Sequence, residues 1–165
     1  MRTIHYLILV LSFSSLSWSQ SPTTTAVNTK NGTVDIPGKW TEFHTEASSG
    51  QTYLKNDEGV IIAVAYNLKK AYPCYKSGVS DFENVQLFHQ WDSDYYKENK
   101  YDTALLKVNE SKISIIWKFN DKRRDNVFLF GSKGNCFLNL MVYTDLWEES
   151  KKISFLEEWY ALNTK

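Results

Sequence analysis

The sequence is poor in the residues that build metal centres and nucleophilic sites, with two cysteines and three histidines among its 165 residues. A zinc site takes three or four protein ligands, and the HExxH spacing of zinc peptidases is absent. Such a ligand set would require four residues to converge: His44, His89, Cys74 and Cys136. Ordinary surface or partly buried side chains explain these residues more simply, so we expect no metal and no cofactor.

The sequence also lacks an excess of charge of either sign, because 19 Lys and Arg residues stand against 19 Asp and Glu residues. Proteins that bind nucleic acid typically carry a clustered basic surface, and so do proteins held to anionic membranes by charge. The basic cluster at residues 122–124 is flanked by Asp121 and Asp125, which is typical of a solvated turn. Neither nucleic acid nor a membrane surface is an expected partner.

After the N-terminal segment, no apolar run approaches about 18 residues, the length that would predict a membrane-spanning helix. At the N-terminus, Arg2 precedes an apolar run of about a dozen residues, too short to span a bilayer. Ser17 and Ser19 then supply the small residues that signal peptidase requires. We therefore predict a signal peptide over residues 1–19, cleaved after Ser19, and a secreted or periplasmic protein with no stable membrane insertion.

The two cysteines leave two alternatives open. An exported protein meets oxidising conditions, so a disulfide between Cys74 and Cys136 would be chemically reasonable. It would close a loop of about 60 residues and add about 3–4 kcal/mol of stability. The other alternative is two separate buried thiols, and sequence alone does not give the distance that decides between them.

Aromatic residues are abundant, with 6 Trp, 10 Tyr and 9 Phe. Each buried aromatic side chain removes about 150–250 Å² of surface from water, so most of them must fill a core. Any that remain exposed would form an aromatic binding surface. Residues 20–32 are rich in threonine and lack apolar periodicity, which predicts a flexible linker. A single domain is then expected over residues 33–163.

Local patterns predict two helices. Ser80 and Glu83 form a capping box that begins a helix extending to about Lys100. Its bulky residues recur every three or four positions and predict one buried stripe, made of Phe82, Val85, Leu87 or Phe88, Trp91 and Tyr95. A second helix is expected over residues 145–163, with Asp145 as its cap and Glu148 three residues later.

Three short strands are expected before the first helix, at residues 34–36, 51–55 and 60–66, and four more between residues 103 and 144. Short polar turns join the later strands, which predicts antiparallel neighbours. Several strands are apolar on both faces, so both faces of the sheet should be covered. The predicted fold is α+β: a three-layer α/β/α sandwich with a mainly antiparallel central sheet, in the order β-β-β-α-β-β-β-β-α.

This order of elements, together with Pro37, Gly38 and Trp40 after the first strand and a hairpin at Gly59, resembles the PsbP-like family in an exported, bacterial-type form. The resemblance covers residues 33–163. It implies an accessory or binding protein without a shared catalytic centre, and it transfers no site residue to this chain.

The predicted function is therefore a non-catalytic protein that contacts a protein partner or a small ligand. One alternative is a hydrolase or metal-dependent enzyme that uses His44, His89 and acidic residues. Another is an immunity-type inhibitor of a partner enzyme. The acidic stretch at residues 92–94 is interpreted as a solvated helix face. A deep pocket with converging titratable residues would count against a purely non-catalytic function.

Overall fold

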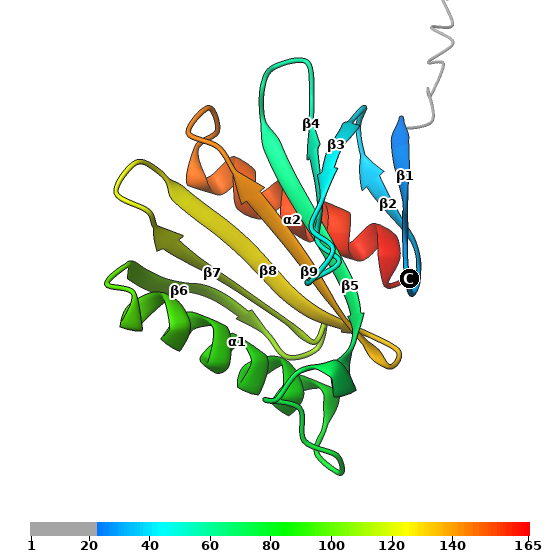
Figure 1. The fold of residues 1–165 in the computed structure, drawn as a ribbon, viewed down its shortest axis with the longest axis vertical. Helices are drawn as coiled ribbons and strands as arrows, with labels where there is room; N and C mark the ends of the chain where they lie inside the picture. Colours follow the sequence, from blue (N-terminus) through cyan, green and yellow to red (C-terminus); the bar gives the residue numbers. More distant parts are fainter. Residues whose placement is uncertain (1–22) are drawn as a thin grey trace, which may run out of the picture.

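The structure is a computed structural model, and it describes residues 23–165. The predicted signal peptide and its cleavage site lie outside these residues. Five strands precede the first helix and four follow it, and a second helix comes last (Figure 1). The strands are β1 (Thr24–Thr29), β2 (Gly32–Pro37), β3 (Thr41–Thr45), β4 (Thr52–Lys55), β5 (Ile61–Leu68), β6 (Asp102–Asn109), β7 (Ser114–Asn120), β8 (Asp125–Lys133) and β9 (Cys136–Tyr143). The helices are α1 (Asp81–Glu98) and α2 (Glu149–Asn163), with a short 3-10 turn at Lys69–Ala71.

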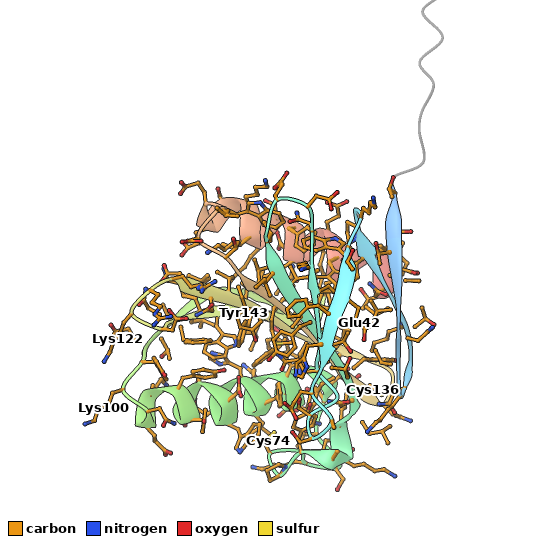
Figure 2. All side chains as sticks on the ribbon, turned by 45° about the horizontal axis from the view of Figure 1, so that its top comes forward. Glu42, Cys74, Lys100, Lys122, Cys136 and Tyr143 are labelled. Atoms are coloured by element: carbon orange, nitrogen blue, oxygen red, sulfur yellow. The ribbon has the colours of Figure 1, made fainter. Side chains whose placement is uncertain are left out.

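Seven strands form one antiparallel sheet in the order β3-β4-β5-β9-β8-β7-β6, and β1 and β2 form a separate hairpin. The two helices cover opposite faces of the large sheet, as Figure 2 shows with α1 below and α2 above. Helix α1 packs against β6, β7 and β8, whereas α2 packs against β8, β9 and β2. The prediction of a three-layer sandwich with a mainly antiparallel sheet is confirmed.

Side-chain alternation along the central strands divides the core into two layers. On β9, Leu138 and Leu140 belong to the cluster beneath α2, whereas Phe137 and Met141 belong to the cluster beneath α1. Successive residues of a strand point to opposite faces, so strands that are apolar throughout can serve two cores at once. The α1 side holds most of the phenylalanines of the sheet, while the α2 side is mainly aliphatic.

The predicted linker at residues 20–32 is wrong for its described part. Residues Thr24–Thr29 form β1, which pairs with β2 in register Val27↔Val34. Val27 is buried in the cluster beneath α2 together with Val34 and Ile36. Threonine and valine both favour strands, and the hairpin buries one face through a single large apolar residue of β1. The folded region therefore begins well before residue 33.

The first helix begins where the sequence predicts. The Ser80 hydroxyl accepts a hydrogen bond from the Glu83 amide at 3.1 Å, and the Glu83 carboxylate accepts one from the Ser80 amide at 2.8 Å. The predicted buried stripe is correct only in its first half. Trp91 and Tyr95 are largely exposed, with 43% and 59% of their surface in contact with solvent.

The predicted cap of the second helix is wrong. Helix α2 begins at Glu149, its N-cap is Glu148, and no side chain caps its first amides. The Thr144 hydroxyl instead accepts a hydrogen bond from the Leu146 amide at 3.1 Å, which holds the preceding segment in a bend. This local bond competes with an earlier helix start. Within residues 23–165, neither helix is long and apolar enough to cross a membrane.

Candidate functional site

A cavity of about 190 Å³ lies where α1 stops covering the large sheet. On the α1 side of β5, Ala63 and Ala65 are buried but small, and they leave space next to the rings contributed by α1 and β8. The cavity is lined by the side chains of Ser49, Gln51, Ala65, Tyr72, Phe88, Trp91, Asp92, Tyr96, Phe128, Phe130, Asn139, Met141 and Tyr143. An engineered apolar cavity of about 150 Å³ is known to hold benzene, so this space admits a ligand with one ring.

The wall of the cavity is aromatic and closely packed. Phe88 of α1 lies between Tyr72, with ring centroids 4.7 Å apart, and Phe130 of β8, at 4.6 Å. Trp91 contacts Tyr72 at 6.0 Å and Phe88 at 5.8 Å between centroids. Such edge-to-face and tilted contacts hold rings in fixed orientations. The cavity therefore has a preformed aromatic lining.

Asp92 of α1 is the acidic residue of this lining. Its carboxyl group is partly buried, and burial alone raises its pKa from the usual 3.8 to about 7. No other residue of the described chain gives it a hydrogen bond or an ion pair that would lower the pKa again. A partly buried carboxyl group with a raised pKa and no partner in the described chain is a candidate for a functional site.

The groups that face Asp92 carry no positive charge. Burial raises the pKa values of the Tyr72, Tyr96 and Tyr143 hydroxyls and of the Cys74 thiol, and the negative charge of Asp92 raises each of them slightly further. A phenol or thiol whose pKa is raised stays protonated at neutral pH. The surroundings of Asp92 therefore consist of neutral hydroxyls, a thiol and aromatic rings.

Asn139 of β9 is a second unpaired polar group in the lining. Its side chain is 4% exposed, and its Oδ1 atom has no hydrogen-bond partner in the part of the chain that the structure describes. The residue lies on the α1 face of the sheet, opposite Ala65 on β5 and Phe130 on β8. Leaving a buried acceptor unpaired costs about 1–3 kcal/mol, so a residue of this kind at this position calls for an explanation.

Tyr143 closes one end of the cavity and separates it from a more open groove. Its hydroxyl accepts a hydrogen bond from the Gln51 amide at 3.1 Å and donates to the Met141 sulfur at 3.4 Å. Tyr143 packs against the cluster beneath α1, so its ring lies on the α1 face of the sheet. Beyond it, Phe43, His44 and Arg124 line a groove of about 410 Å³ that also includes Tyr143. The ring of Tyr143 is thus shared by both hollows.

The two histidines that the sequence offers for catalysis lie in different surroundings. His44 is exposed on β3, where it contacts the Glu46 carboxylate at 3.8 Å and the ring of Tyr53. His89 of α1 packs on Trp117, and burial lowers its pKa. No group of three His, Cys, Asp or Glu side chains within residues 23–165 has the geometry of a metal site. The structure therefore does not bring His44 and His89 into one site.

Cys74 and Cys136 are separate thiols. Cys136 is buried in the cluster beneath α2, whereas Cys74 packs against the cluster beneath α1, so the sheet lies between their surroundings. Figure 2 shows the two residues well apart. Of the two alternatives that the sequence leaves open, the structure has the unbonded pair.

The acidic stretch at residues 92–94 divides between two environments. Asp94 lies on the outer side, where it accepts a hydrogen bond from Lys97 at 3.0 Å and another from Gln90. Asp92 faces the cavity, which the interpretation as a solvated face missed. The signal that would have found it is the spacing of Phe88, Asp92 and Tyr96, because residues four apart share one side of a helix.

Nothing in the sequence indicates that Asn139 and Asp92 line the same cavity. A comparison of the sequence with protein-family models and with curated proteins gave no match.

Proposed function

We propose that this chain is an exported, non-catalytic binding protein that holds a small ligand in the cavity between α1 and the large sheet. The single observation that carries the proposal is the unpaired carboxyl group of Asp92 in an aromatic-lined cavity. Ligand pockets are typically apolar and aromatic, with a few convergent polar groups that orient the ligand.

Core packing alone does not explain this lining. An aliphatic residue at position 92 or 139 would avoid the free energy of burying an unpaired polar group, which is about 1–3 kcal/mol for a neutral one. Asp92 and Asn139 come from α1 and β9, yet both line the same cavity. The Asp92 carboxyl group, which lacks a protein partner there, is best explained by a ligand that supplies one.

A binding function is favoured over catalysis because Asp92 has no titratable partner of suitable pKa. General acid–base and nucleophilic sites pair such a group with a second one, usually a histidine, a lysine, a cysteine or another carboxyl group. None of these lines the cavity within residues 23–165. The raised pKa of Asp92 would count against a non-catalytic function if a second acid–base group lined the cavity beside it, and none does within residues 23–165.

The accessory role implied by the PsbP-like resemblance is compatible with this proposal. Trp91 lines the cavity and is also 43% exposed at its mouth, and Tyr95 is exposed one turn further along α1. A bound ligand would therefore change the environment of a tryptophan that solvent and a partner protein can reach.

The proposal is tested with purified mature protein and a library of one-ring compounds that are cationic, neutral or anionic. We expect members of the library to raise the melting temperature and to change the tryptophan fluorescence. The Trp91→Ala variant, which removes part of the lining, should lose this response. Tyr95→Ala is the matched control, because it removes an exposed aromatic ring from the same helix that does not line the cavity. If no compound binds, or if both variants bind every compound as the natural protein does, the proposal is wrong.

A further inference from the structure

We propose that the ligand of this cavity is a small organic ammonium ion, held by the Asp92 carboxylate and by the faces of the surrounding aromatic rings. This inference rests on the proposed function, since it names the chemical class of ligand for the same cavity.

The first support is charge. The titratable groups that face Asp92 are the phenols of Tyr72, Tyr96 and Tyr143 and the thiol of Cys74, which come from the segment before α1, from α1 itself and from β9. No lysine, arginine or histidine of residues 23–165 lines the cavity. A carboxylate in this setting lacks a counter-ion. A cationic ligand supplies that counter-ion, whereas an anionic ligand would be repelled.

The second support is the aromatic lining. Three rings of the lining form one group, with centroids between 4.7 and 6.0 Å apart: those of Tyr72, Phe88 and Trp91. Asp92 lines the same cavity as these rings. The face of an aromatic ring carries partial negative charge and attracts a cation, most strongly when water is excluded. Cages of aromatic rings are a recurring way in which proteins bind alkylammonium groups.

The third support is hydrogen bonding. The Asp92 carboxylate accepts hydrogen bonds only, and no residue of the described chain lowers its pKa by donating one. This group therefore needs a ligand that donates. A primary ammonium group has three N–H donors, and a quaternary one has none. We infer a primary ammonium group attached to an apolar body of about one ring, the size that the cavity admits.

The raised pKa of Asp92, about 7, adds a property that can be measured. Below pH 7 the carboxyl group of the free protein holds a proton, and a bound cation must displace it. The affinity for an ammonium ion should therefore rise with pH, by up to about tenfold per unit below the pKa, and level off above it. A neutral ligand that needs no carboxylate would not show this rise.

The experiment is calorimetric titration at pH 6, 7 and 8 with three compounds of similar shape: benzylammonium, benzyl alcohol and benzoate. Benzylammonium is expected to bind best, and its affinity should increase about five- to twentyfold between pH 6 and pH 8. Asp92→Asn should lower its affinity at pH 8 at least tenfold and remove the pH dependence. Glu98→Gln, which neutralises an exposed acid on the same helix, is the control and should behave as the natural protein does.

Each contrary outcome is distinct. If benzyl alcohol binds as tightly as benzylammonium with no dependence on pH, the cavity is a binding site but not one for a cation. Tighter binding of benzoate would likewise overturn the ligand class and leave the binding function standing. If none of the compounds binds and the broader one-ring library also fails, the proposed function itself is wrong. The pH dependence is measured on the natural protein, so the test stands even if Asp92→Asn does not fold.

Discussion

Gly131 of β8 lies directly against the ring of Tyr160 on α2, so closely that a Cβ atom at residue 131 would come within 2.2 Å of a ring carbon. The ring has no room to retreat. Tyr160 is 3% exposed, and its hydroxyl accepts a hydrogen bond from the Ser132 amide at 3.1 Å while lying 2.9 Å from the Ser132 carbonyl oxygen. The absence of a side chain at residue 131 therefore allows α2 to lie close to the sheet.

Gly131→Ala should destabilise the protein. The added methyl group forces the Tyr160 ring or the backbone to move, and overpacking of this kind costs about 1–3 kcal/mol or more. Urea denaturation would measure the loss. In the double variant Gly131→Ala/Tyr160→Leu the two effects should not add, because the smaller side chain relieves the clash. Simple additivity would show that the contact is not the cause.

Asp92 should make the stability of the protein depend on pH. Its pKa is about 7 in the folded protein and close to the usual 3.8 in the unfolded chain, so the folded state binds the proton more tightly. The free energy of unfolding therefore falls as pH rises from about 4 to about 7, and above pH 7 the ionised Asp92 destabilises the fold by its full amount. The loss is on the order of 2–4 kcal/mol.

The Asp92→Asn variant checks this linkage. It should match the natural protein near pH 4 and exceed its free energy of unfolding at pH 8, measured by urea denaturation at several pH values. Glu98→Gln is again the control, since its side chain is exposed and should leave the pH profile unchanged. A difference between Asp92→Asn and the natural protein that stays constant from pH 4 to pH 8 would contradict the linkage.

Removing the charged partner of Lys69 should destabilise the protein more than removing Lys69 itself. This lysine is 5% exposed, and its ammonium group contacts the Asp81 carboxylate and the Gly134 carbonyl oxygen, the latter at 2.8 Å. Asp81→Asn leaves a buried charge without its counter-ion and should cost about 3–5 kcal/mol. Lys69→Met should cost less, because Asp81 is about half exposed and still accepts a hydrogen bond from Ser132. A double-mutant cycle measures both, and a larger loss for Lys69→Met would reverse the expectation.

The two helix starts should respond in opposite directions to cap substitutions. Ser80→Ala removes half of an observed capping box and should lower stability by about 0.5–2 kcal/mol. Glu148→Ser places a good cap where no side chain caps α2, and it should raise stability by about 0.5–1 kcal/mol. Thermal unfolding would detect both changes. Glu148→Asp, which keeps the charge, separates the effect of the cap from that of the removed carboxylate.

The features that sequence predicts well are those encoded by near neighbours in the chain. The alternation of residues 113–119, 127–131 and 136–143 assigns each side chain to a face, and the structure has them on those faces. The capping box at Ser80 is equally local. Each of these signals depends on residues that are two to four positions apart, so no knowledge of the tertiary structure is needed.

The features that sequence misses depend on partners far along the chain. Segment Thr24–Thr29 carries only one large apolar residue, and its assignment as a strand depends on pairing with β2 and packing against the cluster beneath α2. The half-correct stripe of α1 has a similar origin. The inward side of α1 runs through Val85, Phe88, Asp92 and Tyr96, so Trp91 lies one position away from it and is partly exposed.

The candidate site was the least predictable part. Acidic residues on a helix are usually solvated, and only the positions of β5 and β9 reveal that Asp92 faces small and aromatic side chains instead. Asn139 lies on the α1 face of β9, but nothing in the sequence identifies that face as the wall of a cavity. The cavity lies beside the small side chain of Ala65 on β5, and sequence does not say what packs above it.

Asn163 in the last turn of α2 joins the beginning of the fold to its end. Its side-chain amide accepts a hydrogen bond from the Asp35 backbone amide at 2.9 Å and donates one to the Asp35 carbonyl oxygen at 2.7 Å, across 128 residues. The β1–β2 hairpin precedes both helices in the sequence, yet the helix that it packs against, α2, follows every strand. Contacts of such sequence separation slow the folding of a domain. The fold therefore cannot be completed until α2 has been synthesised.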